Sequence, residues 1–205
     1  ATLHCHVEGI DMKKGIILAI LGVLTLSMVA CGKAGNSSET REYITSSWSR
    51  SYADVEDLAS NCDVIALVKV KKVMETVVQT GIPFTTFQVE VLFPVYNMNE
   101  GDEFAIFMTG GVKDGITVEV EDDPLLQIGE ECMVFCKENP DGTYQILSGP
   151  QGRYLHQNGK LNSLSVVNDR IREKSIISKI ITVKDMDLSD MISQVKNCLK
   201  DSPVS

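Results

Sequence analysis

The sequence lacks a hydrophobic run long enough to cross a membrane as a helix. Its most apolar stretch, residues 15–30, is interrupted only by Thr25 and Ser27, and it is shorter than the about 20 apolar residues that span a bilayer. The polar stretch after Cys31 contains no cluster of basic residues that would stop transfer through the membrane. We therefore do not expect this segment to be a transmembrane helix.

Positive charge is also scarce. The 205 residues include 19 Lys and Arg against 28 Asp and Glu, which leaves a formal net charge of −9 and an isoelectric point near 4.8. An acidic surface repels the phosphates of nucleic acids and the headgroups of anionic lipids. Nucleic acid is therefore not an expected partner.

Recognisable catalytic motifs are missing as well. The sequence has no zinc-protease helix motif, kinase signature or dinucleotide fingerprint, and its stretches TGGVKDG and SGPQGR lack the Lys-Ser/Thr ending of a phosphate loop. We expect both stretches to form turns. No serine or cysteine motif marks a partner for His156 in general-base catalysis, so we expect this histidine at the surface or at a sheet edge. We predict that the protein is not an enzyme and carries no cofactor.

The sequence does contain an N-terminal leader. Residues 12–30 begin with Met12 and two lysines, continue with an apolar middle and end in small residues, which is the layout of a secretory signal peptide. We interpret residues 1–11 as an upstream extension that is not translated, because the charged start of a signal peptide should be the N-terminus. On this interpretation the His-Cys-His run at residues 4–6 is no metal site.

The end of this leader resembles the lipobox of bacterial lipoproteins. In the stretch SMVACG, the small residue Ala30 immediately precedes Cys31, and Met28 stands where the family most often has leucine. The resemblance implies cleavage after Ala30 and a diacylglyceryl group on the Cys31 thiol, which would hold the mature chain on membrane lipid. The alternative is a plain secretory leader with a coincidental cysteine. We predict a protein anchored on the extracytoplasmic face of the cell membrane.

Residues 31–51 are rich in Gly, Ser, Thr, Asn and charged residues. This composition is typical of a flexible tether, which would lift the folded domain off the membrane. Trp48 belongs either to this tether or to the surface of the domain, and the sequence leaves both alternatives open.

We expect the folded domain to occupy residues 52–164 and to begin with a short helix. Ser51 is a suitable N-cap, and the apolar residues Val55, Leu58 and Ala59 share one face. Strand-like alternation follows, beginning at Val64, Ala66, Val68 and Val70. Six short strands separated by turn sequences, such as residues 139–142 and 158–159, indicate a small antiparallel barrel or sandwich. In the extension over residues 165–205 we expect a strand near residues 180–183 and an amphipathic helix over about 187–200.

The order of these segments carries a second resemblance. The stretches NCDVIALVKVKKV, FTTFQVEVLF, GDEFAIF and IGEECMVFCKENPDGTYQI, within residues 54–161, follow a pattern common in uncharacterised bacterial lipoproteins. More remotely, they are similar to the OB-like barrel of netrin and metalloproteinase-inhibitor domains. The resemblance implies a mainly β fold, a small antiparallel OB-like barrel flanked by a short N-terminal helix and a C-terminal amphipathic helix. Protease inhibition does not carry over, because those inhibitors use a free N-terminal cysteine, whereas Cys31 would be acylated.

Four cysteines remain in the predicted mature domain, namely Cys62, Cys132, Cys136 and Cys198. Cys132 and Cys136 cannot pair if they lie on one strand, because their Cα atoms would be about 13 Å apart and a disulfide tolerates no more than about 7 Å. Two alternatives stay open. Either the thiols are buried as small hydrophobic residues, or Cys62 forms a disulfide with Cys132 or Cys136, which an exported location permits.

The acidic run EVEDDP contains Glu119, Glu121, Asp122 and Asp123. Their oxygens are of the type that binds calcium, but their spacing matches no calcium loop. We expect a solvated acidic turn, and no metal site.

Together these observations predict a lipid-anchored, extracytoplasmic lipoprotein that acts as a non-catalytic binding or structural module at the bacterial cell envelope. Its expected partner is a protein or a glycan that contacts the barrel loops, although this inference rests partly on fold analogy. Two alternatives remain: an envelope hydrolase or processing enzyme with an unrecognised site, and an accessory subunit of a transporter or secretion machine.

Overall fold

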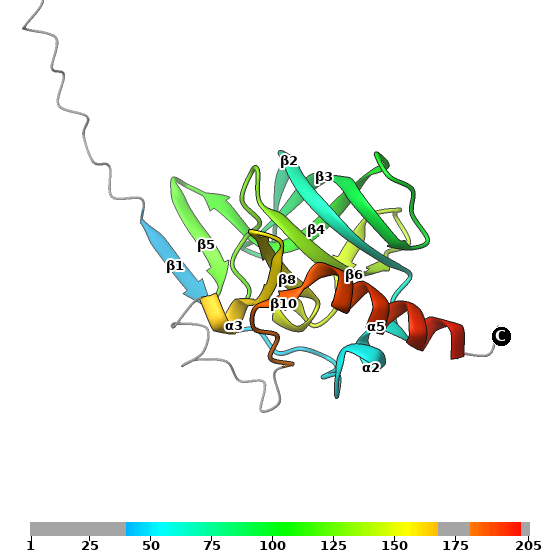
Figure 1. Cartoon of the computed structure of the whole chain (residues 1–205). Coiled ribbons are helices and arrows are strands. Elements are labelled where there is room, and N and C mark those ends of the chain that lie inside the picture. The colour runs from blue at the N-terminus through cyan, green and yellow to red at the C-terminus, as the bar shows by residue number, and fades with distance from the viewer. Residues whose placement is uncertain (1–39, 168–180, 202–205) are drawn as a thin grey trace, which may run out of the picture. The chain divides into compact units, whose positions relative to one another are not determined.

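The computed structural model describes residues 40–167 and 181–201 of the chain (Figure 1). The predicted upstream extension, the signal peptide and Cys31 lie outside the described residues. Of the described residues, 50% are in strands and 17% in helices. The prediction of a mainly β protein with a few helices is thus confirmed.

The bounds of the elements are as follows. The strands are β1 Arg41–Ile44, β2 Val64–Gln79, β3 Ile82–Tyr96, β4 Glu103–Lys113, β5 Ile116–Val120, β6 Glu131–Glu138, β7 Tyr144–Ile146, β8 Arg153–Gln157, β9 Lys160–Ser163 and β10 Met186–Asp187. The helices are α2 Val55–Ala59, the 3₁₀ turn η2 Gly149–Gln151, α3 Leu164–Val167 and α5 Leu188–Asp201.

Five strands close into a barrel, as the sequence predicts. Neighbouring strands pair in the order β2–β3–β4–β7–β6, and β6 returns to β2. The barrel is antiparallel except at one point, where β7 pairs with β4 in parallel through Tyr144 and Ile106. β7 follows β6 in the chain and also pairs with β4, so the strands do not follow one another in a simple up-and-down order. β2 and β3 are the longest strands, with 16 and 15 residues, and they pair along their whole length as a two-stranded ribbon.

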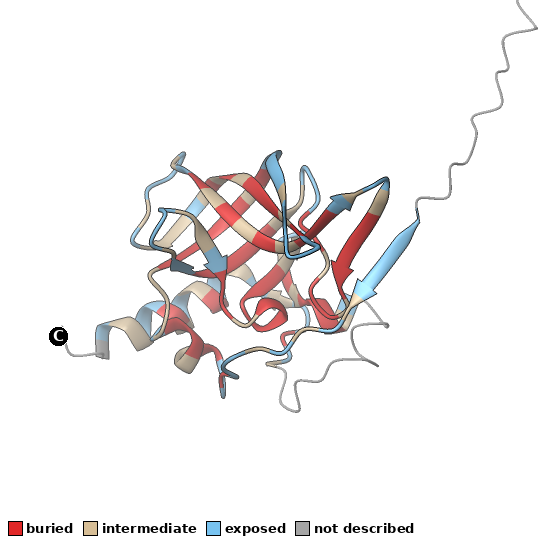
Figure 2. Cartoon of the chain, turned by 180° about the vertical axis from the view of Figure 1, so that it is seen from behind, coloured by how far each residue is buried: buried red, intermediate tan, exposed pale blue. Residues whose placement is uncertain are grey.

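The first part of the long strand β2, residues 64–68, is buried on both faces. Val64, Ala66, Val68 and Val70 point into the barrel core, as their alternation predicts. The intervening Ile65 belongs to a second apolar cluster outside the barrel, together with Phe135, Tyr154 and residues of α2 and α5. The buried residues therefore lie on either side of the barrel wall (Figure 2). This second cluster explains why the flanking helices are part of the fold.

The two flanking helices follow the predicted apolar patterns. In α2, Val55, Leu58 and Ala59 are buried, but the N-cap is Asp54 and not Ser51. The extended backbone of Asp54 lets its Oδ1 accept a hydrogen bond of 2.8 Å from the Asp57 N–H. In α5, the predicted amphipathic face is confirmed, because the second cluster includes residues from this helix.

The second half of the predicted tether is folded, which is a correction. Residues 41–44 form β1, which pairs in parallel with β5 (Figure 1). The Trp48 Nε1 donates a hydrogen bond of 3.2 Å to Asp122 Oδ2, so Trp48 packs on the domain. The polar composition of this segment does not signal these contacts, because they depend on β5 and the loop after it. The predicted tether residues 31–39 lie outside the described part of the chain.

The chain after α3 also differs from the prediction. Residues 181–183 do not form a strand, and the short strand is instead Met186–Asp187, paired with β9. The Ser163 hydroxyl takes the place of a strand partner, because its Oγ accepts from the Val183 N–H at 2.7 Å and donates to the Ile181 carbonyl at 3.0 Å. A side chain thereby satisfies backbone groups that a ladder would otherwise pair.

Candidate functional site

An open cleft lies between the β2–β3 ribbon and the β4–β5 hairpin. It encloses about 250 Å³ and is lined by residues of β1 to β5 and of the loop at residues 125–127. We call it the ribbon cleft. Sequence reasoning missed it, because its lining residues are ordinary strand residues whose proximity depends on the pairing register.

Two glycines give the ribbon cleft its shape. β4 pairs with β3 as far as Thr109 and with β5 from Gly110 onward. A Cβ on Gly110 would lie 2.7 Å from the Val118 carbonyl oxygen, and one on Gly111 would overlap the Thr85 hydroxyl. Residues 110–111 are therefore strand residues and not the predicted turn. Only glycine allows the close approach at which β4 changes its partner.

The floor of the ribbon cleft is polar and already partnered. Thr76 Oγ1 and Thr85 Oγ1 lie 3.1 Å apart, and the Thr85 hydroxyl also donates to the Gly110 carbonyl at 2.8 Å. The buried Glu119 accepts from Arg41 Nη1 at 3.0 Å and from the Leu125 N–H at 3.3 Å. The carboxylate is thus held in place by β1 and the following loop.

The walls of the ribbon cleft are apolar and partly open to solvent. Val73 from β2 and Val112 from β4 are exposed, while Phe87 lies in the barrel core below them. An exposed apolar rim around a partnered polar floor is an arrangement that can bind an amphipathic group by contact.

The acidic run beside the cleft is buried, which corrects the prediction of a solvated turn. Glu119, Asp122 and Asp123 are all buried, and each faces a different partner. Asp122 binds Trp48, and Asp123 Oδ1 lies 3.5 Å from Arg153 Nη2. Burial raises the pKa of Asp123 to about 6, although the Arg153 guanidinium opposes this shift. The three carboxylates thus face separate partners, and no group of metal-ligating residues is found in the part of the chain that the structure describes.

A second pocket lies beside His156 on β8. It encloses about 280 Å³ and is lined by Gly129, Glu130, Glu131, Leu155, His156 and Gln157. His156 is half-buried, and its Nδ1 lies 3.3 Å from Glu131 Oε2, whereas Lys69 Nζ donates to Glu131 Oε1 at 3.2 Å. The hydrogen bond from Lys69, and then that from His156, lowers the pKa of Glu131. The expected edge histidine thus has a carboxylate partner, which the sequence did not reveal because the cross-strand register creates it.

The pocket beside His156 offers weak support for catalysis. A histidine oriented by a carboxylate is suited to act as a general base towards a water molecule, a substrate or a side-chain nucleophile. No serine, threonine or cysteine is among the residues that line this pocket. The ribbon cleft is therefore the stronger candidate site.

The four cysteines of the described residues are free thiols in the structure. Cys132 and Cys136 are buried on the same strand, β6, and burial raises the pKa of both thiols. The Cys62 thiol donates to the Leu58 carbonyl at 3.2 Å. This arrangement corresponds to the first of the two alternatives, and the disulfide from Cys62 stays a prediction for intact-mass measurement to test.

Comparison with known proteins adds no assignment to this geometry. No protein-family model matches the sequence, and no curated protein is significantly similar to it. No helix within residues 40–167 and 181–201 is long and apolar enough to cross a bilayer. Fold and cleft define a small β-barrel protein with an open, mixed polar and apolar cleft.

Proposed function

We propose that the protein is a lipid-anchored, extracytoplasmic binding module that holds a segment of a polypeptide partner in the ribbon cleft. The size of the cleft is the observation that carries this proposal. Sites that enclose small molecules usually measure about 300–1,000 Å³, whereas the ribbon cleft measures about 250 Å³ and is open on one side. It has room for one or two side chains, which is the scale of an anchoring pocket in a protein interface.

The lining favours a polypeptide over a glycan. Val73 and Val112 offer apolar walls, and the threonine hydroxyls on the floor offer polar contacts. The aromatic residue of the lining, Phe87, is 2% exposed and presents no open ring on which a flat ligand surface could stack. The cleft therefore suits aliphatic and short polar side chains.

The cleft can be tested with a photo-crosslinking amino acid. We would place it at Gln127, an exposed lining residue, and as a matched control at Asn197, which is exposed on α5 far from the cleft. Irradiated cells should give a discrete polypeptide adduct from position 127, and Val112→Asp should remove it by charging the apolar wall. A glycan adduct would transfer the proposal to a glycan ligand. The same adducts at both positions, or none at 127, would contradict a binding cleft.

The anchor is a separate part of the proposal and is supported by the lipobox-like stretch that ends at Cys31. Cys31→Ser removes the thiol that would carry the diacylglyceryl group, so the variant should lose incorporated fatty acid and leave the membrane fraction or remain unprocessed. Cys62→Ser makes the same exchange inside the domain and should stay on the membrane. Unchanged retention of the Cys31→Ser variant, or an unmodified mature N-terminus by mass spectrometry, would refute the anchor.

A further inference from the structure

Two hairpin turns meet at one end of the domain. Gly81 lies in the turn between β2 and β3, and Lys113 ends β4 just before the turn into β5. Lys113 Nζ donates a hydrogen bond of 3.0 Å to the Gly81 carbonyl, which joins the two turns. We call residues 78–82 and 112–116 the hairpin tip.

The hairpin tip exposes aliphatic side chains on both hairpins. Val112 is 60% exposed, Val78 51% and Ile82 37%. Val78 pairs with Pro83 and Gln79 with Ile82, so Val78 and Ile82 point to opposite faces of the ribbon. Aliphatic side chains are therefore exposed on both faces of the hairpin tip.

The chain leaves the described domain at the same end. β1 runs parallel to β5, and the Thr117 N–H donates to the Thr40 carbonyl at 3.0 Å. Thr40 therefore lies beside Ile116, at the hairpin tip. Cys31 precedes Thr40 by nine residues, and a chain of that length spans at most about 30 Å. An acyl group on Cys31 would keep the hairpin tip within this distance of the bilayer.

The charge of the hairpin region suits a lipid surface better than the charge of the whole chain does. The hairpin tip contains one lysine, Lys113, and one acidic residue, Asp114, so its net charge is 1 − 1 = 0. The whole chain carries −9. Anionic headgroups therefore repel the hairpin tip less than they repel the acidic protein as a whole.

We propose that the hairpin tip inserts into the lipid bilayer and is a second membrane contact beside the acylated Cys31. This proposal rests on the lipid anchor of the proposed function. The acyl chains hold the chain on the membrane, and aliphatic side chains at the headgroup boundary add a contact that orients the domain. The contact holds the barrel in one orientation. The ribbon cleft, which shares Val112 with the hairpin tip, then opens close to the bilayer and receives a partner presented at the membrane surface.

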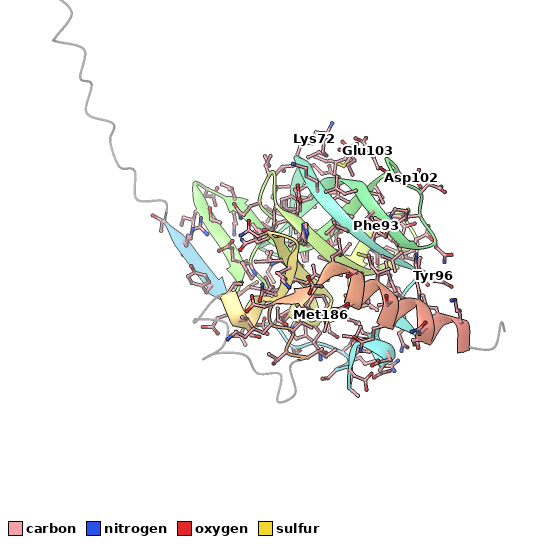
Figure 3. All side chains as sticks on the ribbon, in the orientation of Figure 1. Lys72, Phe93, Tyr96, Asp102, Glu103 and Met186 are labelled. Atoms are coloured by element: carbon pink, nitrogen blue, oxygen red, sulfur yellow. The ribbon has the colours of Figure 1, made fainter. Side chains whose placement is uncertain are left out.

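The test measures how deeply two positions on β3 lie in lipid. Tryptophan replaces Ile82 at the hairpin tip or, as the matched control, Phe93, which is 41% exposed on the same strand and packs near Lys196 of α5. In Figure 3, Phe93 lies nearer to α5 than Lys72 does. Each mature, lipidated full chain is reconstituted on phosphatidylcholine vesicles with or without bromine atoms on the acyl chains. Trp48 is common to all chains, so the parent protein supplies the background.

Brominated acyl chains should quench the fluorescence of Ile82→Trp at least about threefold more strongly than that of Phe93→Trp. Insertion would place the tryptophan at position 82 about 5–10 Å deep, at the boundary between headgroups and acyl chains. Val112→Trp provides a second reporter if Ile82→Trp misfolds. Equal, weak quenching on vesicles that retain the protein would overturn the hairpin-tip contact alone. A blue shift that grows with protein density but not with bromine would assign the tip to a second copy of this chain, and it too would overturn the proposal. Failure to sediment with vesicles would refute the anchor, and the tip contact with it.

Discussion

Asp123 provides a test of the buried charge network beside the cleft. The structure buries this carboxylate completely, and its nearest cation, Arg153, approaches Oδ1 only at 3.5 Å. Asp123 Oδ1 has no hydrogen-bond partner among the described residues. Burial therefore outweighs the guanidinium and raises the pKa of Asp123 from 3.8 to about 6, with further increases from the charges of Asp122 and Glu130.

Because the pKa of Asp123 is raised, the stability that this group contributes decreases as the pH rises. The folded state holds the Asp123 proton more tightly than the unfolded chain does, so ionisation of this group destabilises the fold. Its contribution to stability is fully present below pH 3.8 and is lost as the pH rises through about 6. At 1.36 kcal/mol for each pH unit between the two pKa values, the loss is about 3 kcal/mol.

The measurement compares the wild type with Asp123→Asn by urea unfolding between pH 4 and 7.5. The amide cannot ionise, so the free energy of unfolding of the variant minus that of the wild type should increase by up to about 3 kcal/mol over this interval. Carboxylates that do not interact with Asp123 are common to both chains and cancel in the difference, as does any constant cost of placing an amide beside Arg153. A difference that stays constant with pH, or that falls, would show that Asp123 is not buried in this way.

Two further predictions concern the barrel itself. Gly111→Ala should lower the free energy of unfolding by about 2 kcal/mol or more, because the residue has φ +151° and its new methyl group would overlap Thr85. The control Gly159→Ala, at φ +77° in open space, should lower it by only about 1 kcal/mol. Equal shifts of the melting temperature for the two variants would contradict the close approach at Gly111. The thiols of Cys132 and Cys136 should resist alkylation at pH 8 in the native protein and react fully in urea, because they are buried and their pKa is raised; rapid labelling of the native protein, or an intact mass that indicates a disulfide, would contradict this.

Local sequence chemistry predicted the turns and the strand faces. Asn158 and Gly159 both have positive φ values, which their residue types tolerate, and they form the predicted hairpin turn between β8 and β9. Residues 139–142 likewise close the β6–β7 connection through the Gly142 N–H and the Asn139 carbonyl. The helix over residues 188–201 was predictable from its apolar spacing. These features depend on residues that are close together in the chain.

The candidate site was not predictable in this way. Thr76 and Thr85 meet because a hairpin register aligns them, and Val112 joins them only because Gly110 and Gly111 let β4 bend toward β5. The pairing of β1 with β5 likewise has no signal in the polar composition of residues 40–51. Register and long-range pairing are set by the sum of many weak contacts, which no short motif reports.

Composition and periodicity over a few residues were enough to predict an acidic, β-rich chain with alternating strands, two helices and glycine-containing turns. Which charges are buried, by contrast, depends on the tertiary structure. The run from Glu119 to Asp123 is a polar surface loop on local grounds, and it is buried because Arg41, Trp48 and Arg153 come from distant parts of the chain to cover and partner it. A carboxylate can be buried where such partners converge, and convergence is a property of the fold.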